Sequence, residues 1–263
     1  SYLTNIPGSE WGADKEGVAN AIGMTDAILF LLNNENEYEN SNLLELIDLG
    51  VKGQDLLSTE VFPEGSEEYM SSSERDATFE EILHFVHSFG IQIALPAMQA
   101  SLEIAMAQAI ENNYYNPLSD LPEEDYDKEY FAIGLESYFG LWSHDPLGNG
   151  FCGDSEYPFI YRNDMALGDS LLYGIILGFF GETWQYTPIL PSNFNSSFVL
   201  QIDEGLDYSF RSQYINSAAL SGSNPSSLLG NDFRNHLYGN DGDNLFQGFM
   251  GDDTIYGGIG TDR

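Results

Sequence analysis

Apolar residues recur mainly at helical spacing over the first 190 residues of the chain. Ala27, Ile28, Leu31 and Leu32 predict a helix over 19–33. We expect four more helices, over 78–89 with Gly90 as the stop, 96–112, 125–141 and 165–181. The apolar run LLYGIILGFFG at 171–181 is far shorter than the roughly 20 residues of a membrane span, so we predict a buried segment and no span.

The pattern changes after Pro188 and Pro191 to short alternating segments, which are typical of strands. Segments 197–202 and 208–214 are the clearest examples. The sequence therefore predicts an α+β protein. We expect an α-rich domain at 1–200, a β connection with one degenerate repeat at 201–229, and a distinct repeat region at 230–263.

The last part of the chain repeats every nine residues without an insertion: GNDFRNHLY, GNDGDNLFQ, GFMGDDTIY and GGIGTDR, beginning at Gly230. Glycine opens every unit, and position six is Asn or Asp. Position eight is apolar in each unit that reaches it, including a degenerate unit at 221–229; these residues are Leu228, Leu237, Phe246 and Ile255. We expect Gly and Asn to supply left-handed turns, and the position-eight side chains to stack into one apolar ladder.

Oxygen ligands are concentrated in these turns, and calcium prefers carboxylate and carbonyl oxygen. The predicted calcium ligands are Asn235, Asp241, Asp243, Asn244, Asp252, Asp253 and Asp262. Asn235 and Asn244 lower the ligand charge, so the best sites are expected at Asp253 and Asp262. Because stacked carboxylates repel one another until a divalent ion bridges them, folding and calcium binding should be one event. Low complexity rich in Gly and Asp, the alternative, would not keep a nine-residue register.

These units resemble the hemolysin-type (RTX) calcium-binding repeats of proteins secreted by one-step export. The resemblance covers 221–263 and implies a C-terminal parallel β-roll that folds outside the cell around structural calcium. The final unit stops at its seventh position, Arg263, and we expect more repeats to follow in the full-length protein.

Charge narrows the classes of partner. The chain holds 42 Asp and Glu against 8 Lys and Arg, a formal charge of −34. This excludes most nucleic-acid partners and argues against binding to anionic lipid. A saline or calcium-rich exterior would screen the repulsion among these negative charges. Outside the repeats, the alternative is a salt-adapted acidic surface without cation sites. The single cysteine excludes an intrachain disulfide.

A second metal site is suggested by TFEEILHFVHSFG at 78–90, where Glu80, His84 and His87 share one helix face. Glu81 and His84 form a Glu-x-x-His pair, and EYFA follows at 129–132.

Together, these segments resemble zinc metallopeptidases of the gluzincin kind over 74–142. The resemblance implies Glu81 as general base, His84 as second zinc ligand and Glu129 as third. Glu80 stands where the family has its first His ligand, and this extra negative charge would make bound zinc a weaker Lewis acid.

Three interpretations of the helical region stay open: an inactive descendant of a peptidase, an active metal hydrolase, and chance, with His84 and His87 as core histidines. The main hypothesis is a secreted or cell-surface calcium-binding protein with a structural or adhesive role, built on an inactive peptidase-like domain. Its partners would be calcium and extracellular proteins or glycans. An active secreted zinc metalloprotease is the alternative, and an acidic helical domain that binds calcium or a glycan without catalysis is a third possibility.

Overall fold

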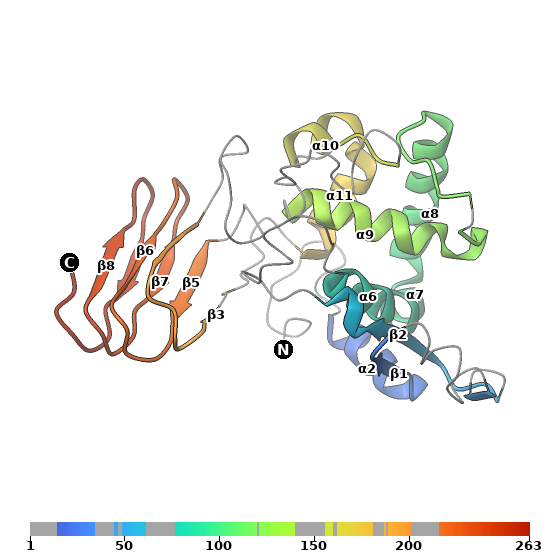
Figure 1. The fold of residues 1–263 in the computed structure, drawn as a ribbon. Helices are drawn as coiled ribbons and strands as arrows, with labels where there is room; N and C mark the ends of the chain where they lie inside the picture. Colours follow the sequence, from blue (N-terminus) through green and yellow to red (C-terminus); the bar gives the residue numbers. More distant parts are fainter. Residues whose placement is uncertain are drawn as a thin grey trace. The chain divides into compact units, whose positions relative to one another are not determined.

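The structure is a computed structural model. It describes residues 15–34, 45–46, 49–61, 77–119, 121–139, 156–159, 162–180, 187, 189–200 and 216–263. The chain divides into two compact units, Ser1–Tyr138 with Trp142–Glu182, and Phe139–Leu141 with Thr183–Arg263. We call them the helical unit and the strand unit (Figure 1). The prediction of an α+β protein is confirmed.

Helices dominate the helical unit. Its elements are α2 (Lys15–Thr25), β1 (Ile28–Leu32), β2 (Gly53–Leu57), η2 (Ser58–Glu60), α6 (Thr78–Val86), η3 (His87–Ile91), α7 (Gln92–Ala94), α8 (Pro96–Glu111), η4 (Glu123–Asp125), α9 (Tyr126–Phe139), α10 (Arg162–Gly168) and α11 (Ser170–Phe180). The helices predicted over 96–112 and 125–141 are confirmed as α8 and α9. The helix predicted over 165–181 is instead two helices, α10 and α11, separated at Asp169.

The helix predicted over 19–33 is wrong in its second half. Helix α2 ends at Thr25, Asp26 has a left-handed backbone (φ 52°), and Ile28–Leu32 forms β1. Strand β1 pairs in parallel with β2, Ile28 opposite Gly53. A short apolar run fits a helix or a strand equally well, and here a distant partner strand decides.

The prediction that Gly90 ends its helix is also wrong. The helical path continues from α6 through the π-helical turn η3 and α7 to Ala94. A Cβ on Gly90 would lie 2.8 Å from Val18 Cγ1 and 3.0 Å from Ile22 Cγ1. The glycine therefore permits close packing of α2 against η3 and is not a helix stop.

The core of the helical unit is built around α9. Its buried apolar side chains are joined by those of α8 and α11; examples are Phe131, Ile133, Leu135, Met98, Leu102, Leu172 and Ile176. The apolar run lies in α11 up to Phe180, and most of its side chains are buried, as predicted. Within the described residues, no single helix is long and apolar enough to span a membrane, although the bent pair Thr78–Ala94 and Pro96–Glu111 (118°) meets the length and composition criteria jointly.

The strand unit consists of two parallel sheets. Its strands are β3 (Ile189–Leu190), β4 (Ser197–Val199), β5 (Ser217–Leu220), β6 (Ser226–Leu229), β7 (His236–Tyr238), β8 (Asn244–Gln247) and β9 (Thr254–Tyr256). The order is β3-β5-β7-β9 in one sheet and β4-β6-β8 in the other. The strand predicted over 197–202 is present at 197–199, and the one predicted over 208–214 lies outside the described residues.

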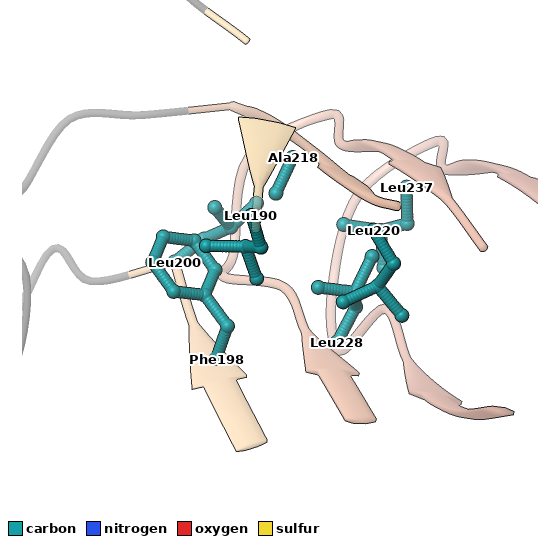
Figure 2. Packing of buried hydrophobic residues seen from close by; sticks show 7 residues of the cluster. All are labelled: Leu190, Phe198, Leu200, Ala218, Leu220, Leu228 and Leu237. Atoms are coloured by element: carbon teal, nitrogen blue, oxygen red, sulfur yellow. The ribbon is translucent and has the colours of Figure 1, made fainter. Parts of the chain in front are cut away.

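The single apolar ladder predicted for position eight is wrong, because the chain passes from one sheet to the other every nine residues. Leu237 pairs with Ile255 in one sheet, and Leu228 pairs with Phe246 in the other. The stacking period is therefore eighteen residues, and two ladders form. Their buried side chains meet between the sheets (Figure 2), in a cluster of Leu190, Phe198, Leu200, Ala218, Leu220, Leu228 and Leu237.

Candidate metal sites

Four turns connect the strands β5 to β9, and a fifth turn follows β9. We number them turn 1 (221–226), turn 2 (230–235), turn 3 (239–244), turn 4 (248–253) and turn 5 (257–262). Because equivalent positions pair eighteen residues apart, turns 1, 3 and 5 stack in one row and turns 2 and 4 in another. Backbone hydrogen bonds join successive turns of one row: Asp241 N donates to Gly222 O at 3.1 Å, and Ile259 N donates to Asn240 O at 3.1 Å. The gaps between stacked turns are the candidate ion sites.

The opening glycine of each unit is required for close contact. A Cβ on Gly239 would lie 2.5 Å from Asn244 Oδ1, and a Cβ on Gly248 or Gly257 would collide with the carboxylate at position six of its own unit. These opening glycines do not have positive φ; the predicted left-handed glycines are Gly222, Gly251, Gly258 and Gly260, and the Asn residues of the turns are not left-handed. The side chain at position six folds back over position one, and only glycine leaves room for it.

The turns fall into two conformational classes. In turns 4 and 5, positions two and four are left-handed: Phe249 (φ 65°), Gly251 (106°), Gly258 (89°) and Gly260 (129°). In turns 2 and 3, position two is an Asn whose side chain hydrogen-bonds within its own turn. Asn231 Oδ1 accepts from Phe233 N at 3.0 Å, and Asn240 Oδ1 accepts from Gly242 N at 2.9 Å. Turn 1 has a single left-handed residue, Gly222 at position two (φ 75°), so left-handed backbone at both positions distinguishes turns 4 and 5.

The carboxylates at position six point toward the preceding turn of their row. Asp253 Oδ1 accepts from Asn235 N at 3.0 Å, and Asp262 Oδ1 accepts from Asn244 N at 2.9 Å. Backbone carbonyl oxygens face the same gaps, since a Cβ on Gly260 would lie 2.5 Å from Gly242 O. The gaps between turns 2 and 4 and between turns 3 and 5 therefore contain the oxygen types that calcium prefers.

The other predicted calcium ligands have different surroundings. Asn235 and Asn244 are buried and hydrogen-bond to Asn231 and Asn240, respectively, in their own turns. Asp243 Oδ1 accepts from Thr261 N at 2.8 Å.

Asp241 is exposed. Asp252 is also exposed, and its carboxylate lies 3.8 Å from the Arg234 guanidinium. The structure thus separates two inward carboxylates, on Asp253 and Asp262, from two outward ones.

Residues 229–263 match the family model of the RTX calcium-binding nonapeptide repeat, with four copies. This segment is a calcium-binding repeat. The predicted resemblance to hemolysin-type repeats is thus confirmed for the end of the chain. No curated protein and no solved structure matches the chain, and the peptidase resemblance of the helical unit rests on its own residues.

Those residues meet in the helical unit. Glu80, His84 and Glu129 each offer a ligand atom within 4.8 Å of the others, the one such group of three found among the described residues. Glu80 and His84 lie one helical turn apart on α6, and Glu129 reaches them from α9. His84 Nε2 lies 3.6 Å from Glu129 Oε1. Two buried side chains from α6 and a second carboxylate from α9 thus place three ligand atoms where one metal ion could contact them all.

Further carboxylates surround this cluster. Glu81 Oε2 accepts a hydrogen bond from Gln54 Nε2 at 2.7 Å and lies 3.6 Å from His84 Nδ1. Burial raises the pKa of Asp55 on β2, and the charge of Glu81 raises it further. His84 Nε2 is buried and makes no hydrogen bond. A cation at this nitrogen would offset the concentrated negative charge, so the residues fit a metal.

His87 belongs to a different network. Its Nε2 lies 2.8 Å from Gln99 Oε1, and Gln99 Nε2 donates to Asp127 Oδ2 at 2.5 Å. His87 is completely buried, and this burial lowers its pKa, so the ring is neutral at pH 7. Its position on the same helix face as Glu80 and His84 suggested His87 as a ligand, but His87 lies outside the group of three.

Proposed function

We propose that this chain is a secreted calcium-binding protein with a structural or adhesive role outside the cell, and that 230–263 form a calcium-dependent β-roll. The observation that carries the proposal is the pair of inter-turn gaps with Asp253 and Asp262 directed into them, within a segment that matches calcium-binding repeats. Each gap offers carbonyl and carboxylate oxygen, which suits calcium and disfavours softer metals.

Calcium would act here through folding. Asp253 and Asp262 use one carboxylate oxygen to bind a backbone N–H of the preceding turn. An ion beside each carboxylate would offset the negative charge that the stack brings together. Extracellular calcium is near millimolar, the range in which weak extracellular sites operate, whereas turns 4 and 5 of the roll would stay open at the low calcium concentration of the cytosol.

A calcium titration of the whole chain, followed by circular dichroism, tests the proposal. We expect calcium to increase the β signal, and magnesium to fail at equal concentration. Asp253→Asn and Asp262→Asn should each raise the calcium midpoint about tenfold, equivalent to about 1.4 kcal/mol, because each removes a charged ligand.

The exposed carboxylates provide matched controls for this titration. Asp241→Asn and Asp252→Asn make the same charge change at outward side chains and should leave the midpoint unchanged. If all four variants shift the midpoint equally, calcium acts through general screening of the acidic chain and the proposed sites are wrong.

A second candidate function, zinc-dependent peptide hydrolysis, is favoured by the meeting of Glu80, His84 and Glu129. Zinc held there would supply a Lewis acid for a substrate carbonyl and for a water molecule. Glu81, however, lies beside His84 Nδ1 and is anchored by Gln54, whereas the ligand group converges at Nε2. This arrangement suits a residue that orients the imidazole better than a general base. It favours a metal-holding, non-catalytic helical unit.

Metal analysis after exhaustive calcium exchange, paired with casein digestion, separates these two functions. We expect His84→Ala and Glu129→Gln to weaken zinc binding at least tenfold. Glu111 is an exposed carboxylate at the end of α8, and Glu111→Gln should retain zinc. Casein digestion should be absent in every case. Chelator-sensitive digestion that disappears in Glu81→Gln, with zinc retained, would instead establish the hydrolase.

A further inference from the structure

The gap between turns 1 and 3 is closed by a side-chain amide. Asn240 Nδ2 donates to Ser221 O at 3.1 Å and to Asn224 O at 3.0 Å. These are the carbonyls of positions one and four of turn 1, so the amide nitrogen sits between two oxygens of the preceding turn. A cation placed in an inter-turn gap would contact the same kind of oxygen.

The Asn240 amide is fixed by its own turn. Its Oδ1 accepts from Asn244 Nδ2 at 3.0 Å and from Gly242 N at 2.9 Å, while Asn244 Oδ1 accepts from Asn240 N at 2.9 Å. Both Asn side chains are buried. Every polar atom of the Asn240 side chain therefore has a partner, and the pair carries no charge to be neutralised.

Later units lack this amide. Position two is Phe249 in turn 4 and Gly258 in turn 5, neither of which carries a polar side chain, and both are left-handed. Position six in these units is an aspartate, and its ionised carboxylate can accept hydrogen bonds but cannot donate them. The gaps between turns 2 and 4 and between turns 3 and 5 thus contain carbonyls and a carboxylate, but no donor amide from position two.

We propose that the Asn240 carboxamide replaces calcium between turns 1 and 3, which restricts calcium to the two gaps closed by Asp253 and Asp262. This inference rests on the proposed calcium-dependent roll and assigns its ions: two for this chain. Neutral donors also link turn 1 to the chain before it, since Ser226 Oγ donates to Phe194 O at 3.1 Å and Ser221 Oγ donates to Leu190 O at 2.7 Å. The strands up to β8 therefore assemble without an ion and serve as a template for turns 4 and 5.

The decisive experiment converts the amide gap into an ion gap with Asn240→Gly combined with Asn244→Asp. Calorimetric calcium titration in about 0.15 M salt, which screens diffuse binding to the acidic surface, should give two ions for the unaltered chain and three for the double variant. Asp241→Asn, an exposed site in the same turn, should keep two.

Hydrogen exchange detected by mass spectrometry provides the structural readout. With a calcium chelator, we expect residues 217–247 of the unaltered chain to stay protected while 248–263 exchange freely. In the double variant, 217–247 should lose protection in chelator and regain it in calcium. Equal protection of 217–247 in the two proteins under chelator, or a double variant that calcium does not restore, would overturn the inference.

The outcomes distinguish this inference from the function on which it rests. Absence of any calcium-induced protection at 248–263 would remove the proposed roll itself. Three ions on the unaltered chain would leave the calcium function intact and show that the Asn240 amide does not exclude an ion.

Discussion

Replacing Asp169 with alanine is expected to lower the free energy of unfolding of the helical unit by about 3 to 5 kcal/mol. This carboxylate lies between α10 and α11 and is 5% exposed. Its Oδ2 accepts from Tyr130 Oη at 2.6 Å and from Tyr157 Oη at 3.1 Å, and its Oδ1 accepts from Leu172 N at 3.3 Å. Alanine would remove this acceptor from the Tyr130 and Tyr157 hydroxyls and from the N-terminus of α11. Urea unfolding followed by the helical circular dichroism signal measures the loss.

The matched control for this substitution is Asp164→Ala on the exposed face of α10, which should change the unfolding free energy by less than about 0.5 kcal/mol. A loss at Asp169 no larger than that of Asp164 would contradict the role of the buried carboxylate.

Ionisation of Asp169 also makes the stability of the helical unit depend on pH. Burial raises its pKa above the ordinary 3.8, and the hydrogen bonds from Tyr130, Leu172 and Tyr157 only partly oppose this. Between pH 3.8 and the native pKa, the folded protein holds a proton that the unfolded chain has released, so stability falls as pH rises through this window. Asp169→Asn removes the titration. Its stability relative to the unaltered chain should therefore increase as pH rises, and a flat difference would contradict the expectation.

The nine-residue repeat was recognisable from sequence because each unit carries its own glycine, oxygen ligand and apolar residue. The arrangement of units was not, because the local period does not reveal that Leu228 and Leu237 belong to different sheets. The role of Asn240 was also hidden, since its amide donates to a turn 16 to 19 residues earlier. A contact of this kind depends on the stacking period.

In the helical unit too, part of the candidate site could be predicted from the sequence and part could not. Glu80 and His84 could be paired from their spacing on one helix, and Glu129 from the peptidase resemblance; the structure brings all three together. The same spacing argument suggested His87, which instead bonds to Gln99 on α8. Gln54 gave no signal in the sequence, because it reaches Glu81 from β2, 27 residues earlier. Periodicity identifies a shared helix face, whereas the neighbours of that face depend on tertiary packing.

Glycine at position one provides the sharpest test of the stacked turns, and Gly239→Ala is expected to destabilise turns 3 to 5 by about 3 kcal/mol. A Cβ there would collide with Gly257 O and lie 2.9 Å from Gly257 C, both backbone atoms of turn 5. Backbone atoms in a paired stack cannot move aside as a flexible side chain can. Relief would require turn 5 to separate from turn 3, which would stretch the hydrogen bond from Gly239 N to Tyr256 O, now 2.7 Å.

Calcium should restore the fold of this variant only in part. The Asp262 carboxylate reaches the gap only when turn 5 lies close to turn 3. We therefore expect a calcium midpoint raised at least tenfold, measured by the β signal, with the helical signal unchanged. Gly174→Ala on α11 is the control: nothing lies within 4 Å of the added Cβ, and alanine favours a helix by up to about 1 kcal/mol over glycine. If Gly239→Ala binds calcium and folds as Gly174→Ala does, turns 3 and 5 are not in contact, and the eighteen-residue stack that brings Asp262 to its ion is wrong.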